Sequence, residues 1–186
     1  MNSLILASSS PRRAELLKQL GFSFTIHFQD YDESIPSNIT PSDAALYIAK
    51  KKISQIDLQK NSTYITADTT VIFNNKVLGK PQSRKQAIEM ISNLSGNTHR
   101  VITGVCIANY QKQSSINCIT EVTFKHLRKE DILYYVEKYN PLDKAGAYGI
   151  QEWIGMIGVK EIKGSYYNVV GLPTEQVYEK LLEFGF

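Results

Sequence analysis

The sequence lacks any hydrophobic run that approaches the length needed to cross a membrane. Its early apolar segment, Leu4–Ala7, is too short for a secretory signal, and serines and arginines follow it directly. Cysteine is scarce too, because the chain has only two, Cys106 and Cys118, both in apparent strands. A hairpin disulfide is one option, but reduced thiols in a cytoplasmic protein are the expectation.

Familiar metal and nucleotide signatures are also missing. The three histidines, His27, His99 and His126, are scattered, and no His-x-x-x-His or Cys-x-x-Cys spacing exists, which argues against a zinc site. No Gly-x-x-x-x-Gly-Lys-Ser/Thr loop occurs, and no Gly-x-Gly-x-x-Gly follows the first apparent strand. Phosphate binding, if present, therefore needs another motif.

Neither sign of charge is in large excess. The formal net charge is +3, which does not demand a nucleic acid but suits local binding of a polyanion. With 42% hydrophobic and 21% charged residues, the 186-residue chain has an ordinary globular composition. We expect a single domain over residues 1–186, built as two lobes.

Hydrophobic periodicity switches repeatedly between strand and helix along the chain. We expect strands at residues 4–7, 22–28, 64–73, 76–78, 101–107, 116–124 and 156–162. We expect helices at residues 11–20, 42–56, 83–94, 129–139 and 175–183, and a turn and bend at 164–171. This mixed order predicts an α/β fold, in which helices pack against a twisted mixed sheet.

The turn after the first strand carries Ser8-Ser9-Ser10-Pro11-Arg12-Arg13. A helix N-terminus has free backbone N–H groups and the positive end of the helix dipole, and serine hydroxyls can cap it. Pro11 suits the first helical position. Arg12 and Arg13 oppose the dipole, which suggests that they hold an anion such as a phosphate chain. An ordinary helix start with solvated arginines is the alternative.

Three further side chains suggest chemistry. Asp68 lies in an apolar, β-rich segment, where a carboxylate needs a partner or a metal. Lys80 is fixed between Gly79 and Pro81, and Gln151 ends a glycine-rich segment. Each also fits a plain structural role, as a strand end, a surface turn or a loop amide.

Together these residues describe a phosphate-cleaving pocket. Arg12, Arg13, Lys80 and a lysine near position 52 can offset the charge of a triphosphate. Asp68, with help from Glu33, can hold Mg²⁺ or activate water. Phosphoryl transfer depends mainly on positioning and electrostatics, so cations, carboxylates and a metal suffice.

Five segments of the chain resemble the signatures of the Maf family of nucleoside triphosphate pyrophosphatases. The resemblance covers essentially the whole chain and keeps the segments in order. They are Ser8–Arg13, Ala67-Asp68-Thr69, Leu78-Gly79-Lys80-Pro81, Asp143–Gln151, and Gly164-Ser165-Tyr166 through Gly171-Leu172-Pro173. The resemblance implies a cytoplasmic, homodimeric enzyme with an elongated, two-lobed fold like that of the inosine triphosphatases, and with the substrate in a central cleft.

The resemblance also implies a role for each site residue. The implied reaction converts a nucleoside triphosphate to the monophosphate and pyrophosphate with a divalent metal, Mg²⁺ or Mn²⁺. Asp68 would be the proton acceptor that activates water and would share the metal with Glu33. The phosphates would contact Arg13, Lys52 and Lys80, with Ser8 and Ser10 as further donors. Which serine contributes more is left open.

Base selection is implied for Arg12, Thr69 and Gln151, all of which resemble the thymine/uracil branch of the family. The chemistry of Gln151 agrees, because an amide offers one donor and one acceptor to the O4 and N3–H of thymine or uracil. A guanine edge presents two adjacent donors and would favour a carboxylate. Glutamine can also pair with adenine, so this reasoning alone does not exclude other bases.

The expected substrates are therefore dTTP and UTP. One alternative is the same chemistry on modified or non-standard nucleotides, as a housekeeping activity. Another is a nucleic-acid-binding or division-regulating module, which would need an extended basic surface with exposed aromatics. Because the positive charge here is tied to turns, we expect neither a nucleic-acid nor a membrane partner.

Overall fold

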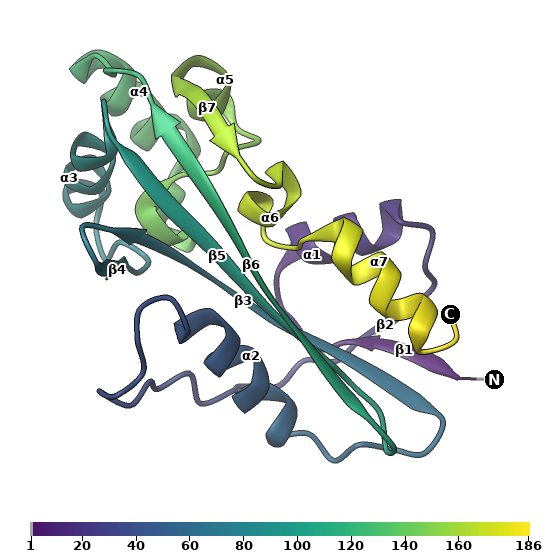
Figure 1. Cartoon of the computed structure of the whole chain (residues 1–186). Helices are drawn as coiled ribbons and strands as arrows, with labels where there is room; N and C mark the ends of the chain where they lie inside the picture. The colour runs from purple at the N-terminus through teal and green to yellow at the C-terminus, as the bar shows by residue number, and fades with distance from the viewer. Residues whose placement is uncertain (1) are drawn as a thin grey trace. The chain divides into compact units, whose positions relative to one another are not determined.

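Seven strands form one mixed sheet in the computed structural model, which describes residues 2–186 (Figure 1). Their order is β2-β1-β3-β5-β6-β7, and β4 pairs with β3. The strands are β1 (Ser3–Leu6), β2 (Thr25–Ile26), β3 (Ser62–Phe73), β4 (Lys76–Leu78), β5 (Thr98–Ala108), β6 (Gln113–Phe124) and β7 (Val159–Lys163). β1 runs parallel to both β2 and β3, whereas β3–β4 and β6–β7 are antiparallel. The predicted α/β class with a mixed sheet is confirmed.

Seven α-helices accompany the sheet in the described residues. They are α1 (Pro11–Gln19), α2 (Ala44–Ser54), α3 (Arg84–Leu94), α4 (Lys129–Tyr139), α5 (Trp153–Gly158), α6 (Tyr166–Val170) and α7 (Thr174–Glu183). Two 3₁₀ turns, Pro141–Asp143 and Ala145–Ala147, lie between α4 and α5. Within residues 2–186, no helix has both the length and the apolar character that a membrane crossing requires.

The chain divides into two compact units. The first contains the chain up to Thr69 together with Thr103–Cys118 and Gly171–Phe186, and the second contains Thr70–Ile102 and Ile119–Val170. The first unit has a buried cluster made of Ala49, Ile53, Tyr64, Cys106 and Ala108. The core of the second unit is larger and includes Ile91, Leu94, Phe124, Tyr135 and Ile154. Both cysteines are free thiols, as expected.

Two segments near the C-terminus differ from the sequence-based expectation. Residues 156–162 were predicted as a strand, but α5 extends to Gly158 and only β7 is extended. A short apolar run does not distinguish strand from buried helix, and Gly155 permits the helix because any Cβ there would overlap the carbonyl oxygen of Ile150. Residues 164–171 were predicted as turn and bend, but they contain α6, which is too short to give a periodic signal.

The boundaries of two further elements differ from those predicted. The strand predicted at residues 22–28 is reduced to the two residues of β2. The hairpin between β5 and β6 turns at Asn109–Lys112, so β6 begins at Gln113 and not at the predicted residue 116. Asn109 explains the shift, because its side-chain oxygen accepts the backbone N–H groups of Gln111 and Lys112, each at 2.9 Å.

A buried histidine lies in the core of the second unit. Nε2 of His99 and the hydroxyl of Tyr148 share a hydrogen bond of 2.6 Å, and the ring of Phe124 lies beside both. Burial lowers the pKa of His99 from 6.5 to about 4, since the imidazolium would lose its hydration there. The folded protein therefore holds His99 neutral where the unfolded chain would protonate it.

This histidine should make stability depend on pH. Between pH 6.5 and about 4 only the unfolded chain binds this proton, so stability falls as the pH drops through that window. The expected contribution is about 3 kcal/mol. Urea unfolding at pH 7 and pH 4 should show a smaller acid loss for His99→Gln than for the parent protein. His126→Gln, at an exposed histidine, is the control and should keep the full loss. Equal losses in all three proteins would contradict the assignment.

Candidate functional site

The corner between β1 and α1 has the predicted capped geometry. Ser10 is the N-cap of α1, and its hydroxyl accepts the backbone N–H of Arg13 at 3.5 Å. The hydroxyl of Ser8 accepts the N–H of Ser10 at 3.2 Å, and Pro11 occupies the first helical position. The serines therefore fix the start of the helix, as their position in the sequence predicted.

Arg13 turns into the first unit and is only 9% exposed. Its Nε donates to the carbonyl of Gly171 at 2.9 Å, and its Nη1 donates to the carbonyl of Ala67 at 3.0 Å and to Ser8 Oγ at 3.2 Å. Its Nη2 donates to Thr69 Oγ1 at 3.0 Å. A guanidinium has five N–H donors, so these four hydrogen bonds leave one donor on Nη2 for a ligand. Arg13 thus joins α1 to the turn after β1, to β3, and to Gly171 at the start of the C-terminal part of the first unit.

Lys52 is the second buried cation of the first unit, at 6% exposed. Its Nζ contacts Oε1 of Glu33 at 2.7 Å and Oδ1 of Asp68 at 3.2 Å, and it donates to the carbonyl of Ala67 at 3.3 Å. One ammonium therefore bridges the two carboxylates that the sequence pointed to, and all three of its donors have acceptors.

The neighbouring lysine explains why the acidic loop lies here. Nζ of Lys51 contacts Asp32 Oδ2 at 2.6 Å and the hydroxyl of Ser34 at 2.7 Å. Consecutive lysines of α2 therefore hold consecutive carboxylates of the loop, Lys51 with Asp32 and Lys52 with Glu33. Lys50 is exposed, so the structure selects Lys52 as the member of the triplet that reaches Asp68.

Asp68 has the electrostatic setting of a general base. Burial raises the pKa of its carboxyl group above the ordinary value, while the charges of Lys52 and Arg13 act in the opposite direction. The side chain is 16% exposed, so solvent still reaches it. A raised pKa makes the carboxylate more basic, so it accepts a proton from water more readily than an ordinary aspartate does.

The carboxylates of Glu33 and Asp68 also suit a hard divalent cation. Mg²⁺ binds through one or two carboxylates together with waters and substrate phosphates. No group of three or more acidic, histidine or cysteine side chains that could hold a metal exists within residues 2–186. Glu33 and Asp68, which both contact Lys52, are thus a pair of carboxylates of the kind that such a cation takes as ligands.

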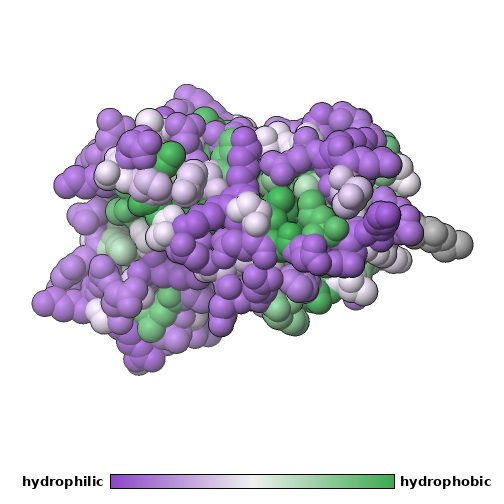
Figure 2. Space-filling model, turned by 90° about the horizontal axis from the view of Figure 1, so that it is seen from below, coloured by the Kyte–Doolittle hydropathy of each residue, from purple (hydrophilic) through white to green (hydrophobic). Residues whose placement is uncertain are grey.

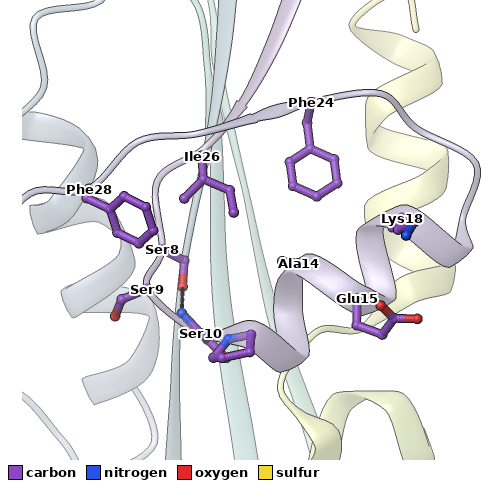
Figure 3. A pocket seen from close by; sticks show the side chains of 10 residues that line it. Ser8, Ser9, Ser10, Ala14, Glu15, Lys18, Phe24, Ile26 and Phe28 are labelled. Carbon is purple, nitrogen blue, oxygen red and sulfur yellow. Dashed lines mark hydrogen bonds between the residues drawn. The ribbon is translucent and has the colours of Figure 1, made fainter.

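A pocket of ≈ 330 Å³ adjoins this corner on the side of β2 (Figure 3). Its floor carries the three serines before α1, and its wall carries Phe24, Ile26 and Phe28. Phe28 is 72% exposed.

The surface seen from below is mostly hydrophilic, with apolar residues in small patches (Figure 2).

The remaining predicted residues divide between the units. Arg12 and Thr69 belong to the first unit, where Thr69 Oγ1 also shares a hydrogen bond of 3.0 Å with Thr103. Lys80 and Gln151 belong to the second unit, and both are exposed. The first unit thus brings together eight predicted residues by direct contacts or in the same helical turn: Ser8, Ser10, Arg12, Arg13, Glu33, Lys52, Asp68 and Thr69.

Sequence reasoning missed two backbone acceptors and one side chain. The carbonyls of Ala67 and Gly171 bind the buried cations, and Thr103 supports Thr69. A backbone carbonyl leaves no residue-type signal, so Ala67 could not be found in this way. Gly171 gave a partial signal, because its φ of +132° favours glycine.

The fold places the chain in a known structural class. It resembles a Ham1 protein from Coxiella burnetii (TM-score 0.52, 15% identity, 98% of this chain and 100% of that one). It also resembles the Ham1 protein of Staphylococcus aureus (TM-score 0.53, 15% identity, 98% and 99%). At this identity the likeness concerns the fold alone.

The sequence defines the family more closely. The family model described as Maf-like protein matches residues 3–184, and the chain belongs to this family. Similar proteins include one from Bacteroides thetaiotaomicron, which is 47% identical over 96% of this chain and 94% of its own length. Another, from Flavobacterium psychrophilum, is 48% identical over 98% and 95%. Both are named dTTP/UTP pyrophosphatase.

The buried guanidinium of Arg13 should be essential for stability. Arg13→Lys keeps the charge but cannot reach four acceptors, so a buried ammonium and unpaired carbonyls would remain. We expect the free energy of unfolding to fall by about 2–4 kcal/mol in urea titrations. Arg84→Lys, at the exposed first residue of α3, is the matched control and should change it by less than about 0.5 kcal/mol. Similar small losses in both variants would show that the four hydrogen bonds contribute little to the free energy of unfolding.

Proposed function

We propose that the protein hydrolyses dTTP and UTP to the nucleoside monophosphate and pyrophosphate. The main support is the relatives named dTTP/UTP pyrophosphatase, which are 47% and 48% identical over nearly the whole chain. The first unit adds a chemical basis, because it joins a carboxylate of raised pKa, a second carboxylate and two buried cations. Water adds to phosphorus, its proton goes to a base, and the bond between the α- and β-phosphates breaks.

Asp68 is the base in this proposal. Lys52 fixes one carboxylate oxygen, Oδ1, which orients the group and balances its charge. Burial raises the pKa of Asp68, so the carboxylate takes a proton from water more readily than an exposed aspartate does. Glu33 and Asp68 would hold a divalent cation, which when bound neutralises charge on the phosphates.

The phosphates would lie near the corner before α1. The remaining donor of Arg13 and the hydroxyls of Ser8 and Ser10 are the groups proposed to hold them there. Lys80 is the proposed cation of the second unit, carried on the bend between Gly79 and Pro81. Its exposure leaves the ammonium accessible to an anion.

Base selection is assigned to Arg12, Thr69 and Gln151. Thr69 is a rigid candidate, because Arg13 and Thr103 hold its hydroxyl at 3.0 Å each. Gln151 supplies one donor and one acceptor, which match O4 and N3–H of thymine and uracil. A guanine edge would leave the amide donor facing donors of the base, which is how such a site rejects a ligand.

Products and a single substitution test the reaction. With dTTP and Mg²⁺, the protein should release pyrophosphate and dTMP, and Asp68→Asn should lower kcat by about 10³-fold because the base is lost. Thermal unfolding should show that this variant stays folded. Asp57→Asn, at an exposed aspartate, is the control and should keep full activity. Release of inorganic phosphate, or an active Asp68→Asn protein, would contradict the mechanism.

A nucleotide panel tests the substrate class. We expect dTTP and UTP to have the highest kcat/KM among natural and modified triphosphates. Gln151→Ala should lower the preference for dTTP over GTP by about tenfold, since hydrogen bonds to the base are lost. Gln82→Ala, an exposed glutamine of the same unit, should leave the preference unchanged. A higher kcat/KM for a modified nucleotide would favour the housekeeping alternative.

A further inference from the structure

A buried hydrogen-bond network holds the segment around Gln151 in the second unit. The hydroxyl of Tyr135, a fully buried residue of α4, donates to Oε2 of Glu152 and accepts the backbone N–H of Gly149 at 3.0 Å. Lys144 lies on the other carboxylate oxygen, with Nζ at 3.2 Å from Oε1 of Glu152. One tyrosine thus binds the chain on both sides of Gln151.

The backbone of the segment closes on the same carboxylate. The N–H of Glu152 donates to the carbonyl of Gly149 at 3.0 Å. A Cβ added to Gly149 would lie 2.9 Å from Cδ of Glu152, so glycine is needed for the carboxylate to pack there. The turn and the Glu152 side chain are therefore a single packed unit.

A second anchor lies just before this turn. Tyr148 is buried and shares a hydrogen bond of 2.6 Å with His99. Ile150 is buried as well, whereas Gln151 is exposed. The chain is thus fixed on both sides of one outward-facing amide.

Burying this network costs desolvation free energy that a turn does not require. A tyrosine hydroxyl and a largely buried carboxylate must both lose hydration, and an apolar pair of similar size would avoid that cost. Burial, and then the hydrogen bond to Glu152, raise the pKa of Tyr135, so its hydroxyl stays protonated and remains a donor. Buried polar networks of this kind fix one conformation, and an amide that must distinguish bases needs a fixed direction.

We propose that Tyr135 and Glu152 are positioning residues that fix Gln151 for recognition of the base. The proposal rests on the function proposed above, in which Gln151 contacts the base. Neither residue needs to touch the nucleotide, because each acts through the backbone of the turn.

Tyr135→Phe removes only the hydroxyl. We expect KM for dTTP to rise about tenfold with kcat nearly unchanged, because a misdirected amide weakens binding before and during reaction alike. The preference for dTTP over GTP should fall in parallel. Hydrogen exchange should become faster at the amides of Gly149 and Glu152, which donate to Tyr135 and to the Gly149 carbonyl. Tyr134→Phe is the matched control, since its hydroxyl pairs with Lys138 Nζ at 2.7 Å on the same helix. It should change none of these values.

A double-mutant cycle separates positioning from general stability. If Tyr135 acts through Gln151, Tyr135→Phe should raise KM in the parent protein but not in the Gln151→Ala background. Equal increases in both backgrounds would overturn the proposal, as would a lower kcat with unchanged KM. If Tyr135→Phe is poorly folded, Glu152→Gln can replace it, because glutamine keeps the shape of the side chain. We expect Glu152→Gln to raise KM for dTTP about threefold.

The exchange measurement keeps the two proposals distinct. A parent protein inactive on dTTP would contradict the proposed function without bearing on the network. Faster exchange at Gly149 and Glu152 in Tyr135→Phe would still support the positioning role of the network, and unchanged exchange would overturn it whatever the substrate.

Discussion

Two buried cations converge on one backbone carbonyl, that of Ala67 in β3. Arg13 reaches it at 3.0 Å and Lys52 at 3.3 Å. A buried charge is tolerated only when acceptors replace its lost hydration. The strand, both helices that carry the cations, and the Gly171 carbonyl must therefore keep their places for the first unit to fold. The candidate chemistry depends on this constraint, because the next residue along β3 is Asp68.

Buried charges of both signs face one another in the first unit. Arg13 and Lys52 are opposed by Asp68 and Glu33, and burial and the cations have opposing effects on the pKa of Asp68. The carboxylates therefore already offset much of the positive charge of these two cations. In the proposed function, the negative charge of a triphosphate would need further cations, such as Arg12 or a divalent metal ion.

The sequence was most informative where residue type and local geometry agree. Ser10 and Pro11 predicted the start of α1, and the β-rich run around Asp68 predicted β3, because capping and strand patterns are local. It failed at α5 and α6, where tertiary contacts decide. Asn168 of α6 is held by the carbonyl of Val101 and the hydroxyl of Thr120, far away in sequence. Residue patterns alone indicated only a lysine near position 52; the family resemblance named Lys52, and in the structure this member of the triplet contacts Asp68.

Full occupancy of the donors also limits how a substrate can be held. All three N–H donors of Lys52 have acceptors, so a phosphate oxygen that reaches this ammonium must replace Glu33, Asp68 or the Ala67 carbonyl. Glu33 is the acceptor that a phosphate oxygen would replace most readily, because the side chain of Glu33 is 52% exposed whereas that of Asp68 is 16% exposed. Exchange at Glu33 would leave Lys52 oriented on Asp68. Lys52 would then connect a bound phosphate to Asp68, the proposed base.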